Sequence, residues 1–192
     1  MNRALEIVLS WLEKQGCYVG RDIIWSKAHG RRFAEAKLQV YGVKGLYTKE
    51  VELYAVGFSE EASPRSIEAE LRRYFWFAHK VYYASPSSLP ETTRQRLAEL
   101  GAGLLKLNLE KRDATVVFEA RKNKPVLQAL YDLLYYRMRL CICRSCKRYV
   151  KKADGLEGTF SLASIKGFEV VTCLCKNCAS KELSSPRSSF GP

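Results

Sequence analysis

The sequence has no long apolar segment and only two histidines among its 192 residues. No apolar run approaches the roughly 18 residues that a helix needs to cross a bilayer. The first sixteen residues, MNRALEIVLSWLEKQG, carry charged side chains where a signal peptide has an unbroken apolar stretch. These absences predict a cytoplasmic protein with no membrane partner.

Several well-known active-site motifs are also missing. The chain contains no P-loop, no dinucleotide-binding fingerprint, no G-x-S-x-G elbow and no persuasive Cys–His nucleophile pair. His29 lies in the polar turn AHGRR, and His79 lies among aromatic residues, so neither is expected to be a catalyst. The common nucleotide-dependent and nucleophilic enzyme classes are therefore not predicted.

The composition indicates one sizeable core and a basic surface. Hydrophobic residues make up 47% of the chain and charged residues 27%, as in ordinary globular proteins. The formal net charge is +12. A charge of this sign and size favours a polyanionic partner, for which nucleic acid is the default expectation.

Hydrophobic periodicity predicts a helix, three strands, a helix, a strand, a helix and two more strands. Leu5, Val8, Leu9 and Leu12 form one face of the first helix, which Gly16 ends. Ser63 and Pro64 open the second helix. The strands are expected at 17–26, 33–42, 50–58, 80–85, 102–109 and 114–120, with the third helix at 91–100. A further helix at about 125–139 leads into a cysteine-rich segment.

The strongest motif is a cysteine unit that occurs twice. Six of the seven cysteines lie in the last third of the chain, as C-x-C-x-x-C from Cys141 to Cys146 and again from Cys173 to Cys178. Without an export signal, such cysteines are expected to be reduced and metal-bound rather than paired. A C-x-x-C pair places two thiolates on one tight turn, and two such turns supply the four sulfurs of a tetrahedral Zn²⁺ site.

We therefore predict a structural Zn²⁺ ion bound by Cys143, Cys146, Cys175 and Cys178. Cys141 and Cys173 are expected to be flanking strand residues, although the ligand set could shift to include one of them. An iron–sulfur cluster and unliganded buried cysteines are the alternatives. A module of about 40 residues cannot build an adequate core, so the metal would supply the folding free energy. Loss of a thiolate should then unfold the module and spare residues 1 to about 135.

The cysteine segment resembles a zinc ribbon, or a treble clef if CASKEL forms a helix after the second pair. Such modules usually bind nucleic acid or other proteins. Basic residues beside the cysteines suit a phosphate surface: Arg144, Lys147, Arg148, Lys151, Lys152, Lys176 and Lys181.

The order of elements before residue 125 resembles the restriction-endonuclease-like fold of the PD-(D/E)XK nuclease superfamily, particularly its MmcB-like DNA-repair members. Local likenesses carry the resemblance: ALEIVLSWLEKQG, FAEAKLQVYG, VELYAVGFS, LRRYFWFAHKVYYASP and LGAGLLKLNLEKRDATVVFEA. The resemblance implies an α/β fold in which a mixed sheet is flanked by helices. It also favours DNA over RNA as the partner.

The family's catalytic centre consists of an acidic residue on the second strand and a Glu-x-Lys on the third, which together hold Mg²⁺. Glu35 can fill the first position. With VELYAVGFS (51–59) as the third strand, Gly57 and Ser59 stand where the Glu and the Lys should be, which implies a degenerate centre. The competing alignment uses Asp22, Glu35 and Lys37 as an intact site. In a third interpretation, Glu35 and Lys37 form only a surface ion pair.

These observations predict a nucleic-acid-binding protein, with DNA favoured by the resemblance. It would comprise a nuclease-like α/β domain at residues 1–139, a zinc module at 140–183 and a flexible tail at 184–192. It is not expected to be an enzyme; the alternatives are an active Mg²⁺-dependent nuclease and a zinc-containing adaptor for a protein partner. The expected nucleic-acid-binding residues are Arg31, Arg32, Arg72, Arg73, Lys80, Arg144, Lys147 and Arg148.

Overall fold

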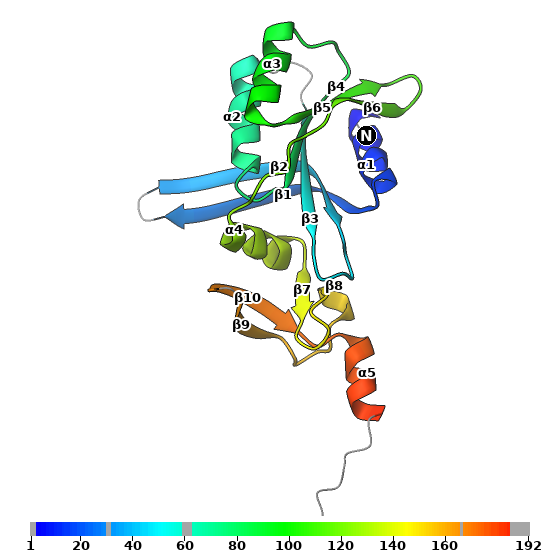
Figure 1. Ribbon diagram of the computed structural model, residues 1–192, viewed down its shortest axis with the longest axis vertical. Helices are drawn as coiled ribbons and strands as arrows, with labels where there is room; N and C mark the ends of the chain where they lie inside the picture. Colours follow the sequence, from blue (N-terminus) through cyan, green and yellow to red (C-terminus); the bar gives the residue numbers. More distant parts are fainter. Residues whose placement is uncertain (1–2, 30–31, 59–62, 166, 185–192) are drawn as a thin grey trace, which may run out of the picture.

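The computed structural model describes residues 3–29, 32–58, 63–165 and 167–184. It contains two β-sheets arranged one beyond the other along the long axis of the molecule (Figure 1). The larger sheet is built from residues before 119 and the smaller from residues after 139. Among the described helices, none is long and apolar enough to cross a membrane.

The larger sheet has six strands in the order β1-β2-β3-β4-β5-β6. Pairing is antiparallel from β1 to β3, parallel from β3 to β5 and antiparallel between β5 and β6, so the sheet is mixed. The predicted order of elements is therefore confirmed. The strands are β1 (Cys17–His29), β2 (Arg32–Lys44), β3 (Glu52–Phe58), β4 (Lys80–Ser85), β5 (Gly103–Asn108) and β6 (Asp113–Phe118).

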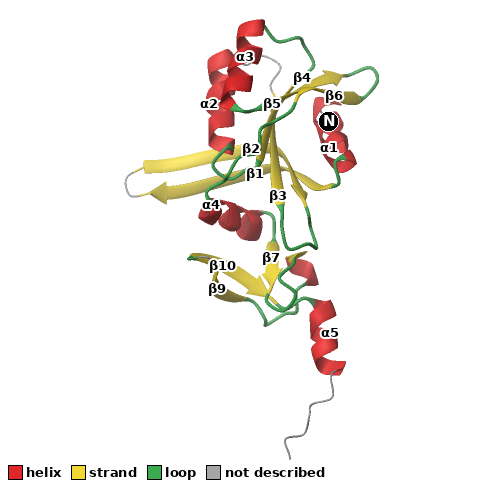
Figure 2. Ribbon diagram, viewed as in Figure 1, coloured by secondary structure: helices red, strands yellow, loops and turns green. Residues whose placement is uncertain are grey.

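Helices cover both faces of this sheet (Figure 2). α1 (Arg3–Lys14) buries Ile7, Val8 and Trp11 against one face, and Gly16, with a φ of +77°, ends the turn that follows. α2 (Pro64–Tyr74) and α3 (Glu91–Leu100) pack on the opposite face. The sheet interior is apolar on both sides because each face has its own helical layer.

α2 begins where the sequence predicts. The Ser63 side chain accepts a hydrogen bond from the Ser66 backbone N–H, and Pro64 occupies the first helical turn, where a missing N–H costs nothing. Ile67, Leu71 and Tyr74 then recur on the face that is buried against the sheet.

The predicted helix at about 125–139 forms two segments. α4 (Leu127–Asp132) continues into a π-helical turn, Leu133–Arg137, which we label η1. Leu130, Leu133 and Leu134 are buried along the way. This helical segment connects the two sheets.

The smaller sheet has the order β8-β7-β10-β9. β7 and β10 pair in parallel at its centre, and the outer strands pair with them in antiparallel fashion. The elements are β7 (Leu140–Cys143), β8 (Tyr149–Lys151), the 3-10 turn η2 (Lys152–Asp154), β9 (Ser161–Ile165), β10 (Phe168–Cys173) and α5 (Lys176–Ser184).

The two sheets share one hydrophobic core. Ile142, Tyr149 and Val170 of the smaller sheet belong to the same buried cluster as Leu53 of β3 and Leu133 of η1. The β2–β3 loop also bonds to β8, because the backbone N–H of Tyr149 donates to the Thr48 carbonyl at 2.8 Å. The two sheets therefore pack directly against each other, although the chain passes from one to the other near residue 140.

Candidate metal centre

Four cysteine sulfurs converge at the C-terminal end of the molecule. The Sγ atoms of Cys143, Cys146, Cys175 and Cys178 all lie within 4.8 Å of one another. They are the four residues that the sequence predicts as ligands. Cys143 and Cys175 are buried, and Cys146 and Cys178 are partly exposed.

The first cysteine pair lies in the turn between β7 and β8. The backbone N–H of Cys143 donates to the Arg148 carbonyl at 2.9 Å, and that of Lys147 donates to the Cys143 carbonyl at 2.8 Å. Lys147 has a φ of +60°, a left-handed conformation that lets the chain reverse directly after Cys146. This tight turn directs both thiols to one side.

The second pair lies at the start of α5. The backbone N–H groups of Cys178 and Ala179 donate to the Cys175 carbonyl at 2.9 and 3.0 Å, so Cys178 falls on the first helical turn. α5 therefore follows the second pair directly, as the resemblance to a treble clef requires.

Parallel pairing of β7 with β10 brings the two cysteine turns together. Cys143 lies opposite Cys173 in this register, and the Arg144 N–H donates to the Cys173 carbonyl at 2.8 Å. The Cys175 N–H then donates to the Cys143 sulfur at 3.4 Å. Backbone geometry therefore places the sulfurs together.

The pKa values of three cysteines of the cluster are shifted in different directions. Burial raises the pKa of Cys143, but backbone N–H groups from Cys175, Cys146 and Ser145 outweigh it and lower the pKa to about 6. Burial raises the pKa of Cys175 to about 12 and also raises that of Cys146. A cation bound by all four sulfurs would displace the remaining protons, since metal ligands must be deprotonated.

The donor set fits a closed tetrahedral metal site. Four thiolates around Zn²⁺, at about 2.3 Å each, are separated by about 3.8 Å, and the observed cluster is only slightly wider than that. Four protein sulfurs fill a tetrahedron and leave no open position for substrate. The cysteines could therefore hold a metal ion in a structural role.

Cys141 and Cys173 form a disulfide bond, which corrects the expectation that the clustered cysteines are all reduced. The two residues do lie on strands, as expected: Cys141 is the second residue of β7, and Cys173 is the last residue of β10. Their Cα atoms are 6.1 Å apart, within the range that a disulfide spans. Sequence spacing could not reveal this pair, because the parallel register of the two strands creates it.

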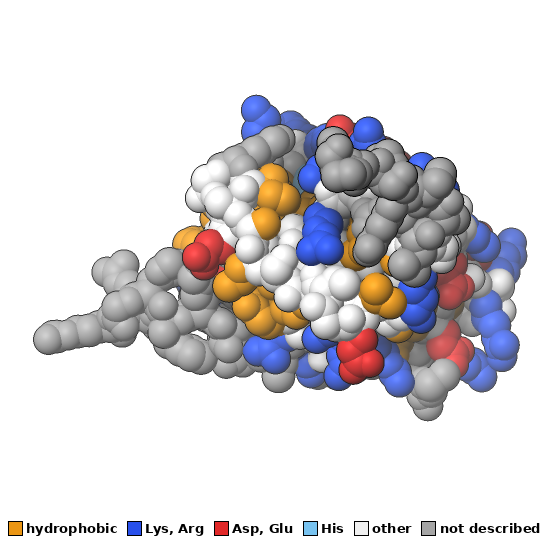
Figure 3. All heavy atoms as spheres, turned by 90° about the horizontal axis from the view of Figure 1, so that it is seen from below, with side chains coloured by type: hydrophobic (Ala, Val, Ile, Leu, Met, Phe, Trp, Pro, Cys, Tyr) orange, Lys and Arg blue, Asp and Glu red, His pale blue; other side chains and the backbone are white. Residues whose placement is uncertain are grey.

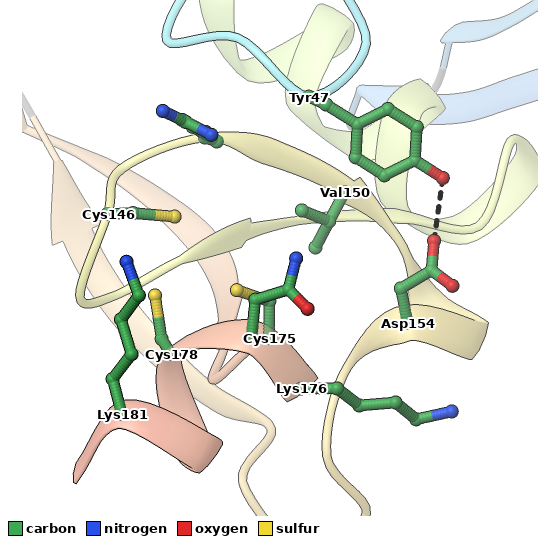
Figure 4. A pocket seen from close by; sticks show the side chains of 10 residues that line it. Tyr47, Cys146, Val150, Asp154, Cys175, Lys176, Cys178 and Lys181 are labelled. Atoms are coloured by element: carbon green, nitrogen blue, oxygen red, sulfur yellow. Dashed lines mark hydrogen bonds between the residues drawn. The ribbon is translucent and has the colours of Figure 1, made fainter. Parts of the chain in front are cut away.

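A hollow of about 570 Å³ opens beside the cysteine cluster (Figure 4). Tyr47 lies across the hollow from α5. The Tyr47 hydroxyl donates a hydrogen bond to the Asp154 carboxylate at 2.7 Å. That hydrogen bond raises the pKa of Tyr47. Arg148, Lys176 and Lys181 contribute the cationic part of the lining.

The predicted nucleic-acid-binding residues before residue 81 are described only in part. Arg31 lies outside the described residues, and Arg32 is placed only as the first residue of β2. The Arg72 side chain is held by Glu68 at 2.6 Å, whereas Arg73 is exposed. Lys80 lies over the Tyr54 ring, 5.5 Å from its centroid.

Three of the predicted basic residues lie beside the first cysteine pair. Arg144, Lys147 and Arg148 are all exposed and follow one another around the turn between β7 and β8. Seen from below, Lys and Arg side chains lie along much of the outline of the molecule (Figure 3).

The alternative nuclease residues are only partly brought together. The Lys37 amine lies 3.7 Å from the Asp22 carboxylate, and both side chains are exposed. The side chain of Glu35 lies outside the described residues, although its backbone pairs with Ser26. Lys37 thus contacts Asp22 across the hairpin, and the proposed Glu35–Lys37 ion pair is not tested.

Position 57 faces the helical layer. A Cβ at Gly57 would lie 3.1 Å from a Leu71 methyl and 3.4 Å from the Tyr74 ring, so a larger side chain there would meet α2. Ser59 lies outside the described residues. Within the described part of the chain, the cysteine cluster is the only grouping of three or more His, Cys, Asp or Glu that could hold a metal ion.

Comparison with known proteins gives no family. No protein-family model matches the chain, and no curated protein matches it. A solved protein of unknown function from Silicibacter pomeroyi aligns at 15% identity over 72% of this chain and 90% of its own, with a TM-score of 0.45.

Two further solved structures align less extensively. The protein of unknown function AF1548 aligns at 15% identity and a TM-score of 0.39, over 54% of this chain and 57% of its own. Protein VC1899 from Vibrio cholerae aligns at 11% identity and a TM-score of 0.40, over 56% of this chain and 29% of its own. All three TM-scores lie below 0.5, so these likenesses carry no argument about function.

Proposed function

We propose that the protein binds nucleic acid, preferentially DNA, through a basic surface built around a structural zinc site. The observation that carries the proposal is the position of exposed Arg144, Lys147 and Arg148 on the turn that presents Cys143 and Cys146. A metal that fixes this turn would fix the positions of three cations. Fixed cations release counterions from phosphates, the main source of affinity in such complexes.

Zinc is the metal we propose for the centre. Thiolate sulfur is a soft ligand that selects Zn²⁺, Cu⁺ or iron–sulfur chemistry, and a closed set of four favours Zn²⁺ in a structural role. The preference for DNA rests on the resemblance to PD-(D/E)XK proteins. In this proposal the nuclease-like sheet serves for binding and is catalytically degenerate, which the glycine at position 57 supports.

Elemental analysis of the purified full-length protein tests the metal. We expect about one zinc per chain, and we expect Cys146→Ser to lose it because three thiolates hold Zn²⁺ far more weakly than four. Cys17→Ser is the matched control, since Cys17 is buried against the larger sheet and far from the cluster in sequence. Iron with a visible charge-transfer band, or no metal, would contradict the assignment.

A salt titration of nucleic-acid binding by fluorescence anisotropy tests the partner. We expect the affinity for duplex DNA to fall with salt at a log–log slope of roughly −0.9 per phosphate contacted. Arg144→Glu with Arg148→Glu should weaken binding to all sequences about equally, because phosphate contacts carry no base information. The control, Lys111→Glu with Arg112→Glu, makes the same charge change in the exposed β5–β6 turn.

Equal effects of the two double variants would mean that only net charge matters. Absence of binding to any DNA or RNA at low salt would contradict the proposal and favour the alternative of a zinc-containing adaptor for a protein partner.

A further inference from the structure

A second hollow, of about 810 Å³, lies between the two sheets and is lined by residues from both. Tyr18 and Tyr41 of the β1–β2 hairpin line one side, and the turn after β8 lines the other. Its volume falls within the range of known ligand sites. We call it the inter-sheet groove. None of Arg144, Lys147 and Arg148 lines it, whereas Lys151, Lys152 and Lys176, which the sequence also assigns to a phosphate surface, do.

The charge in the inter-sheet groove is strongly one-sided. Its single acidic residue is Glu157, while its cationic residues are Arg137, Arg139, Lys151, Lys152 and Lys176. Within the described part of the chain, none of these five cations forms an ion pair of the kind that holds Arg72 to Glu68. Cations gathered without counter-charges repel one another, and an anionic ligand would relieve that repulsion.

The groove also presents aromatic rings to these cations. Tyr18 is 38% exposed, and the Lys151 amine lies 4.5 Å from the centre of its ring. Tyr41 crosses directly over Gly20, where any Cβ would lie about 2.2 Å from the tyrosine hydroxyl. The glycine therefore leaves room for the second ring in the groove wall. An exposed ring beside cations that form no ion pair is an arrangement that can stack an unpaired base and bind the adjoining phosphates.

A similar combination of a tyrosine and cations occurs in the neighbouring hollow, which shares Lys176 with the groove. That residue lines both the inter-sheet groove and the hollow beside the cysteine cluster. The hollow beside the cysteine cluster also combines an exposed tyrosine, Tyr47, with cationic Arg148. Two tyrosine-and-cation hollows flanking one lysine suit a ligand with repeated bases and phosphates better than they suit a single small anion.

We propose that the inter-sheet groove binds single-stranded nucleic acid, with Tyr18 stacking on a base and Arg139 and Lys151 binding its phosphates. This inference rests on the proposed nucleic-acid function and names the form of the ligand. Bases in a duplex already stack on one another, so Tyr18 could not stack on them without opening the helix.

Arg139 allows a test that separates binding from folding. It has a φ of +55°, a conformation in which glycine is unstrained, so Arg139→Gly should fold at least as stably as the native chain. Arg112 is a matched control, because it is also an exposed arginine with a positive φ, +51°, but lies in the β5–β6 turn. The two substitutions remove the same charge from the same backbone conformation.

The experiment measures fluorescence anisotropy of the full-length protein with labelled oligothymidylate, oligouridylate and duplex DNA, each about 20 nucleotides long to exceed one binding site. We expect single strands to bind about tenfold more tightly than the duplex. Arg139→Gly should weaken single-strand binding severalfold and reduce the salt slope by about 0.7, while Arg112→Gly should do neither. The thymidylate and uridylate arms distinguish DNA from RNA as the source of the strand.

Tyr18 supplies the second arm. Tyr18→Ala should weaken single-strand binding about tenfold and leave duplex binding unchanged, whereas Tyr18→Phe, which keeps the ring, should bind like the native protein. Equal affinity for single and double strands, or equal effects of Arg139→Gly and Arg112→Gly, would overturn the proposal that the inter-sheet groove binds single strands. The proposed nucleic-acid binding itself would then still stand. Absence of binding to all three ligands would overturn the proposed function itself.

Discussion

His79 lies where β4 begins, and it accepts a hydrogen bond through an unprotonated ring nitrogen. The Leu53 backbone N–H donates to its Nδ1 at 3.0 Å, while the His79 backbone N–H donates to the Leu53 carbonyl at 2.8 Å. Burial lowers the pKa of His79, and Lys122 lowers it further, against an opposing contribution from Glu52. The folded chain therefore holds this ring neutral.

This residue predicts a pH dependence of stability. The folded-state pKa lies below that of the unfolded chain, so the stabilisation is complete above about pH 6.5 and declines as the pH falls toward the folded-state value. The free energy of unfolding in urea should thus decrease between pH 7.5 and pH 5.5. His79→Gln, which keeps an acceptor without a titrating proton, should flatten this decrease, and His29→Gln should not. A flat profile for the native protein would contradict the role of His79.

Individual residues differ in how far the sequence could predict them. The two C-x-x-C pairs were predictable because their spacing alone makes a two-thiol turn. The Cys141–Cys173 bond was not, since it depends on the parallel register of β7 with β10, and the two cysteines are 32 residues apart in sequence. The sequence also gave no sign that Tyr18 belongs with Lys151, because only the packing of the two sheets places an N-terminal strand residue beside a C-terminal lysine.

Among the elements, β3 is the one on which the expected lack of catalysis rests. Residue 57 is a glycine, and a Cβ at this position would lie 3.1 Å from a Leu71 methyl group of α2. A Glu side chain there would therefore contact the helical layer instead of binding a metal ion in water. We expect no cleavage of linear DNA or RNA with Mg²⁺ or Mn²⁺ above the rate of a buffer control, followed on denaturing gels. Cleavage that disappears in both Glu35→Ala and Lys37→Ala would show instead that Asp22, Glu35 and Lys37 form an active site.

Element type and order were predictable for the larger sheet because its helices and strands have clear 3.6- and 2-residue periods. Boundaries were less so. β1 extends beyond the predicted 17–26 to His29, and β2 begins at Arg32, because their mutual pairing continues toward the hairpin turn. At its other end, β2 extends beyond residue 42 to Lys44, which pairs with Cys17 and Glu52. The π-helical turn at Leu133–Arg137 could not be distinguished in sequence from an ordinary helix, because both bury leucines at similar spacing.

At the scale of the whole molecule, the shared core predicts that metal loss destabilises both sheets. Ile142, Tyr149 and Val170 would leave a cluster that includes Leu53 and Leu133 if the smaller sheet unfolded. Each buried side chain of this size contributes about 1.5–3 kcal/mol, so loss of all three on treatment with a strong zinc chelator should lower the melting temperature of the larger sheet by roughly 10 °C or more.

Tryptophan fluorescence measures this effect selectively. All three tryptophans, Trp11, Trp25 and Trp76, precede residue 80 and so report on the larger sheet alone. A chelator-induced shift of the fluorescence melt is the expected result. An unchanged melt would show that residues 1 to about 135 fold independently of the metal, as the sequence alone suggests.

The inter-sheet groove has one wall from each sheet, and this construction makes the two ligands thermodynamically linked. If metal binding holds the smaller sheet in the position that completes the groove, then the factor by which zinc tightens strand binding must equal the factor by which a bound strand tightens zinc binding. A chain carrying nucleic acid would then release its metal less readily than a free chain, so occupancy of the groove would govern how the protein responds to zinc scarcity.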